Sequence, residues 1–157
     1  MRRTRMLLVV AAVVASVAGG AAWATPGTPG VAATTWARGT LSPHFKLKLH
    51  DSSTPADAVV QQVMIPPGGF TGWHTHPGPA IVIVKSGRLT IYEANDASCT
   101  GTTYAKGQIL VDEGYGNVHI GHNSDPTTTT ELWITFLDVP PGTSPRIDAA
   151  SPGNCPF

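Results

Sequence analysis

The chain has 157 residues, in which 10 Lys+Arg balance 10 Asp+Glu, so its formal net charge is zero. Charged residues make up 13% of the chain, and no basic run follows the first few positions. A nucleic acid binds mainly through its phosphates to clustered Lys and Arg, so composition and charge exclude nucleic-acid binding as an expected function.

The first 24 residues have the three-part layout of a secretory signal peptide. Three arginines within the first five positions precede an apolar run, and residues 22–24 then read A-x-A, a pattern cut by signal peptidase. The apolar run is shorter than the ~20 residues of a membrane-spanning helix, so an uncleaved anchor is the lesser alternative. The Arg2-Arg3 pair leaves twin-arginine export open beside the general route. We expect a secreted, extracytoplasmic protein with no membrane contact beyond residues 1–24.

The exported part is the length of one domain. Without residues 1–24 it has 133 residues, with seven basic against ten acidic side chains and a net charge of −3. Residues 25–40, which begin TPGTPGVAATT, predict a flexible lead rich in Pro, Gly and Thr. We expect residues 41–157 to form the folded domain.

Seven short strands are expected after this lead. The sequence has no sustained helical period, and Gly, Pro, Asn and Asp separate runs that alternate apolar with polar residues or are rich in β-branched ones. Such a pattern predicts an all-β sandwich or barrel. The expected strands cover residues 45–50, 58–65, 80–87, 88–94, 108–111, 118–123 and 130–138.

The two cysteines, Cys99 and Cys155, both lie in the exported part. An even pair in an exported chain favours one disulfide, with two free thiols or a thiol ligand as the alternatives. The bridge would span 56 residues and stabilise the fold by ~4 kcal/mol in the chain-entropy model. The C-terminal tail is too rich in proline for a central strand. We therefore expect it to lie over the barrel, pinned by Cys155 to the loop around Cys99.

The segment WHTHPGPA, residues 73–80, carries two histidines one residue apart. Residues i and i+2 of a strand point to the same face, so His74 and His76 would offer two imidazole nitrogens to one Fe, Mn, Ni, Cu or Zn ion. The alternative is a pair of exposed strand histidines, or one histidine packed against Trp73. The H-x-H pattern between glycines favours the ligand interpretation.

A wider set of residues resembles the two-part motif of the cupin superfamily. Its usual parts are G-x5-H-x-H-x(3,4)-E-x6-G and G-x5-P-x-G-x2-H-x3-N, and the resemblance covers about residues 58–138. The resemblance implies a single-domain cupin-like (jelly-roll) β-barrel in which His119 is the third metal ligand. The matched residues are Gly68, His74, His76 and Gly87 in the first part, and Gly116, His119 and Asn123 in the second.

The chain departs from the cupin motif at two places. In the second part, Gly114 stands where the proline is usual, and the upstream Gly107 is one residue out of place. In the first part, Ala80 stands where the glutamate is usual, and its methyl group cannot bind a metal. The resemblance then implies three neutral ligands, which leave the charge of +2 on a divalent ion and favour an anionic exogenous ligand. Asp112 or Glu113 in place of the glutamate is the alternative, although acidic loop residues are more often simply solvated.

The implied cofactor is a divalent transition metal: Fe, Zn, Cu or Ni. Manganese is less favoured, since it prefers oxygen ligands. His122, three residues after His119, would face the other way, and Trp73 is expected to pack in the sheet. Glu93 and Gln108 are candidate polar groups of a pocket.

Three functions stay open at the level of sequence. The first is a metal-dependent dioxygenase or isomerase acting on a small molecule in the barrel, with catalytic residues that the sequence does not identify. The second is a non-catalytic module that binds a metal or a small molecule, and the third is a structural barrel without metal. The resemblance also implies a possible homodimer, formed through the edges of sheets.

Overall fold

The computed structural model describes residues 33–41, 47–49 and 54–156. The predicted signal peptide and the first half of the lead, residues 25–32, lie outside the described residues. Residues Thr35–Phe157 form one compact unit. Among the described residues, no helix has the length and apolar character needed to cross a membrane.

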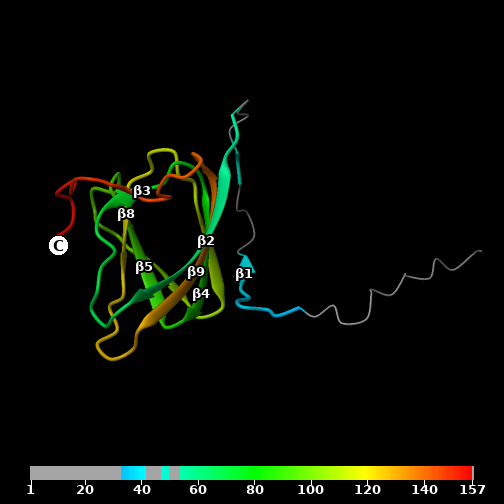
Figure 1. Cartoon of the computed structure of the whole chain (residues 1–157). Coiled ribbons are helices and arrows are strands. Elements are labelled where there is room, and N and C mark those ends of the chain that lie inside the picture. The colour runs from blue at the N-terminus through cyan, green and yellow to red at the C-terminus, as the bar shows by residue number, and fades with distance from the viewer. Residues whose placement is uncertain (1–32, 42–46, 50–53, 157) are drawn as a thin grey trace, which may run out of the picture. The chain divides into compact units, whose positions relative to one another are not determined.

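The described residues form ten strands in two five-stranded sheets that lie opposite each other (Figure 1). The ladders are antiparallel apart from the short parallel pair of β1 with β7. The first sheet has the order β1 (Thr40–Leu41), β7 (Gln108–Asp112), β4 (Ala80–Ser86), β9 (Thr130–Val139), β2 (Asp57–Ile65). The second has the order β10 (Ile147–Asp148), β3 (His74–Thr75), β8 (His119–His122), β5 (Arg88–Glu93), β6 (Thr102–Ala105).

This architecture confirms the all-β, jelly-roll fold class. It corrects one detail, because no ladder between described strands joins the two sheets, which are therefore not closed into a barrel. The main core fills the space between them: along β9 every second side chain from Thr130 to Phe136 is buried, as the two-residue period of a strand requires. The buried apolar residues of this core are Ile65, Ala80, Val82, Val84, Leu89, Leu110, Leu132, Ile134, Phe136 and Val139.

Six of the seven expected strands are present, each within one or two residues of its predicted bounds. The expected strand over residues 45–50 is wrong in its described part, since residues 47–49 form no strand and Leu47 and Leu49 are exposed. An alternating apolar and polar pattern indicates a strand only when a neighbouring strand pairs with its backbone and an apolar layer covers its apolar face. The end of the predicted lead contacts the domain, because Trp36 stacks on Trp133 with ring centroids 5.7 Å apart.

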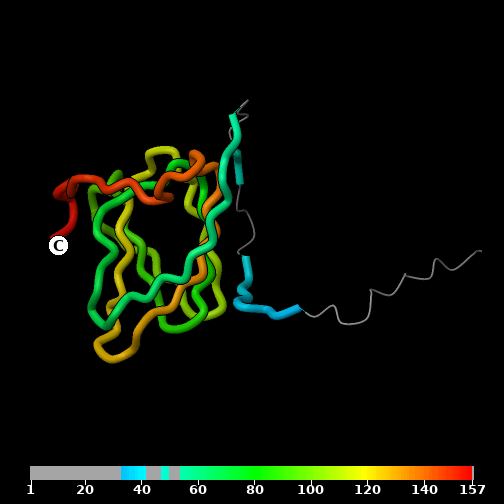
Figure 2. Tube along the Cα trace, viewed as in Figure 1, coloured from blue at the N-terminus to red at the C-terminus, as the bar shows by residue number. Residues whose placement is uncertain are grey.

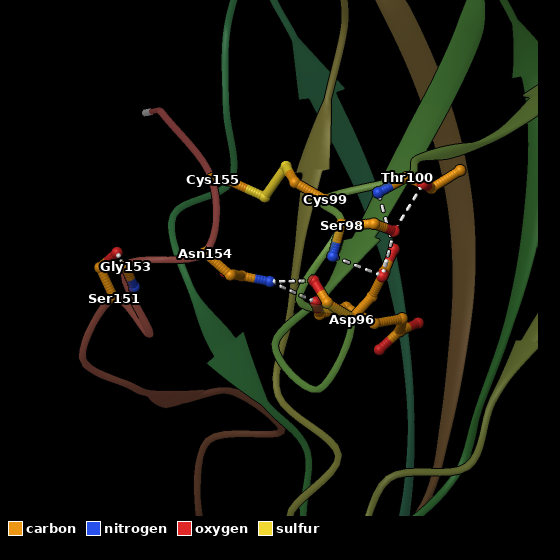
Figure 3. The surroundings of a disulfide bond; sticks show 9 residues. Asp96, Ser98, Cys99, Thr100, Ser151, Gly153, Asn154 and Cys155 are labelled. Atoms are coloured by element: carbon orange, nitrogen blue, oxygen red, sulfur yellow. Dashed lines mark hydrogen bonds between the residues drawn. A yellow bond between two sulfur atoms is a disulfide. The ribbon is translucent and has the colours of Figure 1, made fainter.

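The C-terminal tail follows the course expected for it. After β9 it runs across one end of the two sheets, adds β10 to β3 at the edge of the second sheet, and continues to the C-terminus (Figure 2). Cys155 forms a disulfide with Cys99, with a Cα–Cα distance of 5.3 Å, which confirms the predicted bridge (Figure 3). Beside it, the Asn154 Nδ2 donates to the backbone carbonyls of Glu93 at 3.0 Å and Asp96 at 2.6 Å. The tail is thereby tied to the end of β5.

Candidate metal centre

The structure brings the three motif histidines together between the sheets. His74 lies on β3 directly opposite His119 on β8, and His76 follows β3 by one residue. Their exposed fractions are 7% for His74 and 6% for each of the other two. One ring nitrogen of each residue lies within 4.8 Å of one nitrogen of both others. The three histidines therefore converge on one small, water-poor space.

Backbone carbonyls orient two of the three rings. The Nδ1–H of His74 donates to the carbonyl of Gly72 at 2.8 Å, and the Nδ1–H of His76 donates to the carbonyl of Pro145 at 2.7 Å. Because a carbonyl only accepts, each neutral ring carries its proton on Nδ1 and its lone pair on Nε2. Metal-binding histidines are typically held in this way by a partner on the other ring nitrogen.

Burial keeps the three imidazoles neutral. Loss of solvent, with a smaller contribution from the nearby His119, lowers the pKa of His74 from 6.5 to about 3. Burial also lowers the pKa of His76, although its hydrogen bond to Pro145 opposes the shift. The pKa of His119 is likewise lowered by burial, against the opposing effect of the Asp112 carboxylate. At neutral pH all three rings are in the form that binds a metal.

The loop before His119 explains why glycine replaces the motif's proline at position 114. Gly114, Tyr115 and Gly116 have φ angles of 66°, 51° and 92°, which proline, with φ near −65°, cannot adopt. A Cβ at Gly114 would also collide with the carbonyl of Gly78. The backbone N–H of Tyr115 donates to the carbonyl of His76 at 3.0 Å. This tight turn therefore packs against the segment that carries His76.

Of the two acidic residues that the sequence offers as substitutes, only Asp112 reaches the histidines. Glu113 is exposed, whereas Asp112 is 7% exposed and pairs in register with Ala80 across β4 and β7. One oxygen, Oδ1, lies 3.6 Å from the Nδ1 of His119, and the other, Oδ2, lies 3.9 Å from the Nε2 of His76. A carboxylate is thus present at the site, on a strand other than the one that carries the motif glutamate.

No protein-family model matches the chain, and no curated protein matches it significantly. Similar solved structures include a conserved protein with a double-stranded beta-helix domain from Klebsiella pneumoniae, 25% identical over 60% of this chain and 72% of that chain, with a TM-score of 0.46. A cupin superfamily protein from Desulfitobacterium hafniense is 7% identical over 54% and 69%, with a TM-score of 0.43. A cupin-2 domain protein from Shewanella frigidimarina is 20% identical over 57% and 82%, with a TM-score of 0.40.

Each of these is a likeness of structure only. The two facing five-stranded sheets and the three motif histidines between them are observed in this chain itself, and they agree with the resemblance of its sequence to the cupin motif.

The histidines stand between two cavities. One, of about 100 Å³, is mainly apolar and includes the rings of His74 and His76 and the polar side chains of Gln61 and Arg146. The other, of about 280 Å³, is polar and includes His119. The apolar residues of the first are Val63, Val82, Leu132, Ile134 and Phe136. The polar residues of the second are Glu93, Asn95, Tyr104, Asp112, Glu113 and Asn117.

The remaining residues named from the sequence divide between these surroundings. Glu93 lines the polar cavity as expected, and burial raises its pKa. Gln108 does not line either cavity; its Oε1 accepts from the backbone N–H of Ala105 at 2.7 Å, so its prediction as a pocket residue is wrong. Trp73 packs in a second apolar cluster with Ile120 and Cys155, in agreement with the prediction that it packs in the sheet. His122 stacks on Phe70, with ring centroids 4.0 Å apart, and takes no part in the site.

Two side chains at the site were missed at the level of sequence. Asn117 donates through Nδ2 to Glu93 at 3.1 Å and to Asp112 at 3.0 Å. Arg146 comes from the proline-rich tail, and its Nε donates to Asp148 at 2.7 Å. Neither has a spacing that relates it to the motif, so only the folded chain reveals their place.

Proposed function

We propose that the protein is exported and binds one divalent transition metal (Fe, Zn, Cu or Ni) through His74, His76 and His119. The observation that carries this proposal is the convergence of three buried, neutral imidazoles, two of which are fixed by backbone carbonyls with Nε2 free to bind. Histidines that merely pack in a core have no need to gather their ring nitrogens. The disulfide and the predicted signal peptide support export.

The donor set fits such an ion in chemistry and nearly fits it in geometry. Imidazole nitrogens suit Zn, Cu, Fe and Ni. Two nitrogens bonded at about 2.1 Å to one ion lie at most about 4.2 Å apart, so a separation of 4.8 Å within the cluster would contract by at least about 0.6 Å on binding. When bound, the ion would supply Lewis acidity or redox chemistry.

The apolar cavity beside the histidines suits a small anionic molecule. Its walls are apolar side chains of β2, β4 and β9, which exclude water, and Arg146 places a guanidinium among them. A guanidinium donates two parallel hydrogen bonds to a carboxylate and would orient it toward the ion. The protein groups here bind and orient, and the reaction class depends on the ion.

A non-catalytic module that captures a metal or a small anion is the second candidate. One observation favours it: among the described residues that line the apolar cavity, no Asp, Glu, Tyr or Lys is present to exchange a proton with a bound molecule. Turnover that requires the metal would favour the enzyme, and binding without turnover would favour the module.

Elemental analysis of the mature protein, purified from an exported fraction without a histidine tag, tests the metal site. We expect near-stoichiometric transition metal in the wild type and its loss in His119→Ala. His122→Ala is the matched control, because this histidine lies outside the cluster and should leave the metal content unchanged. A wild type that stays metal-free after reconstitution with Zn²⁺, Cu²⁺, Ni²⁺ and Fe²⁺ would overturn the proposal in favour of a structural fold.

A further inference from the structure

The glutamate of the cupin motif is absent, and a carboxylate from another strand reaches the same space. We propose that Asp112, on β7, is the fourth protein ligand of the metal and supplies the negative charge that Ala80 cannot. This inference rests on the three-histidine site proposed above and goes beyond it, since it changes both the coordination and the metals that the site accepts.

Strand register places Asp112 where a residue-80 carboxylate would point. Ala80 on β4 and Asp112 on β7 are direct partners in an antiparallel ladder. Side chains of direct partners leave the sheet on the same face, with Cβ atoms about 4.5–5.5 Å apart. Ala80 is fully buried and Asp112 nearly so, which places both on the inner face. A carboxylate at position 112 therefore enters the interior beside the place that a glutamate at position 80 would occupy.

Two lone-pair atoms face each other across the site. His76 uses its only ring proton on the carbonyl of Pro145, so its Nε2 is an acceptor. The Oδ2 of Asp112, also an acceptor, lies 3.9 Å from it. Two buried acceptors at this distance repel unless a hydrogen-bond donor or a cation stands between them. A shared divalent ion satisfies both, and 3.9 Å lies within the ~4.2 Å that two ligands of one ion can span.

The same oxygen has no other use in the part of the chain that the structure describes. Asp112 is more than nine-tenths buried, yet its Oδ2 has no hydrogen-bond partner among the described residues. An unpaired buried carboxylate oxygen destabilises the fold, because it loses its hydrogen bonds to water and forms no hydrogen bond in the protein. A bound cation would remove that cost.

Asn117 holds the carboxylate in the orientation that leaves Oδ2 for the ion. Its Nδ2 amide donates one hydrogen to the Oδ1 of Asp112 and the other to the Oε2 of Glu93. Both amide hydrogens are used, so Asn117 fixes Asp112 on one side and keeps Glu93 in the polar cavity. Asn117 acts through Asp112 and is a positioning residue.

The added charge alters which metals the site accepts. Three neutral histidines leave a divalent ion with its full charge of +2, whereas one aspartate reduces it to +1. An anionic oxygen ligand also suits harder ions. We therefore expect the site to bind Mn²⁺ in addition to Zn²⁺, Cu²⁺, Ni²⁺ and Fe²⁺. The three histidines by themselves predict weak Mn²⁺ binding.

Metal affinity and spectroscopy of the mature, disulfide-bonded protein test this inference. Chelator competition would measure Zn²⁺ and Mn²⁺ binding in the wild type, in the near-isosteric Asp112→Asn and in Asp112→Ala. We expect both variants to lose at least tenfold in Zn²⁺ affinity and to lose measurable Mn²⁺ binding. Glu113→Gln is the matched control, because it removes the neighbouring exposed charge, and it should stay within about twofold of the wild type.

A spectrum separates a ligand from a residue that only orients His119. With Cu²⁺ bound, loss of a charged oxygen from the coordination shell shifts the g∥ and A∥ values of the electron paramagnetic resonance spectrum in Asp112→Asn. Unchanged affinity and an unchanged Cu²⁺ spectrum in Asp112→Asn would overturn the inference while the three-histidine site stands. Failure of the wild type to bind any metal would instead overturn the proposed function. Recovery of Mn²⁺ binding by Ala80→Glu in the Asp112→Ala background would support the shared position of the two carboxylates.

Discussion

The two cavities beside the histidines are built from different parts of the chain and from different chemistry. The apolar one is walled by the long strands β2, β4 and β9 of the first sheet, whose buried side chains also form the main core. The polar one lies where β5 and β6 of the second sheet approach β7, and it holds three carboxylates. Packing on one side thus supports the fold, while hydrogen bonding on the other orients a charge. Substitutions on the two sides should separate stability from metal affinity.

The largest effect on stability is expected on the apolar side. Phe136 is 4% exposed and its ring contacts that of His76, with centroids 4.8 Å apart. Phe136→Ala should lower the free energy of unfolding by about 3–5 kcal/mol, because the lost contacts leave a cavity. Urea denaturation of the metal-free protein would measure this loss. Glu113→Gln, an exposed substitution, should lower the free energy of unfolding by about 0.5 kcal/mol or less. A smaller loss in Phe136→Ala than in Glu113→Gln would contradict the contrast between the two sides.

Acid should destabilise the metal-free protein through the histidines that the two cavities share. Unfolded histidines take up protons near pH 6.5, whereas folded His74 stays neutral down to about pH 3. The unfolded state therefore binds more protons over this range, and the free energy of unfolding falls as the pH is lowered. The slope approaches about 1.4 kcal/mol per pH unit for each such histidine.

Urea denaturation between pH 7 and pH 4 would measure this slope. His74→Asn, which removes one titrating group, should reduce it. A free energy of unfolding that stays constant over this range would contradict the assignment of a buried, neutral His74.

On the polar side, Asn117→Ala should lower metal affinity far more than stability. The alanine no longer holds the Oδ1 of Asp112, and loss of such an outer partner typically costs 10–100-fold in affinity. Chelator competition with Zn²⁺ would give the value. Asn95→Ala is the matched control, since Asn95 lines the same cavity but is exposed and should leave affinity unchanged. If the two substitutions changed Zn²⁺ affinity equally, Asn117 would have no specific role in orienting Asp112.

The smallest effect is expected at Arg146, whose side chain is 37% exposed and already paired with Asp148. With Co²⁺ bound, Arg146→Gln should weaken the binding of oxalate, a small dicarboxylate probe, by about three- to tenfold. Arg146→Lys, which keeps the charge but not the planar fork, should lose less. Optical titration of the Co²⁺ spectrum would follow binding. Unchanged oxalate affinity in Arg146→Gln would show that anions do not use this cavity.

Much of the fold and part of the site follow from local patterns in the sequence. Six strands are visible as apolar or alternating runs, and the three histidines stand in a recognisable spacing. Leu47 and Leu49 mislead, because alternation does not reveal whether a strand finds a neighbour. The short strands β1, β3 and β10 form through partners distant in sequence rather than through their own patterns. The short β6 forms by pairing with β5, the strand before it in the chain.

The role of Asp112 shows most clearly what the sequence alone withholds. In the sequence it is one of two adjacent acidic residues. Such residues are more often exposed to solvent, and in the structure this is true of Glu113. What distinguishes it is the register of β4 against β7, which places it opposite Ala80. A shift of one residue would turn its side chain to the other face. Register depends on the whole sheet, so the missing carboxylate could be noticed in the sequence but its substitute could not be chosen.

The disulfide implies that the proposed site is completed only after the two cysteines are oxidised. Cys155 brings Asn154 to the backbone of Glu93, the Glu93 carboxylate shares the amide of Asn117 with Asp112, and Asp112 faces the histidines. Before oxidation this series of contacts lacks its covalent end, so the reduced chain should hold metal more weakly than the oxidised one. If the protein is exported as proposed, the chain would hold its ion more weakly in a reducing compartment than after the bridge forms. The metals present outside the cell would then have the larger part in filling the site.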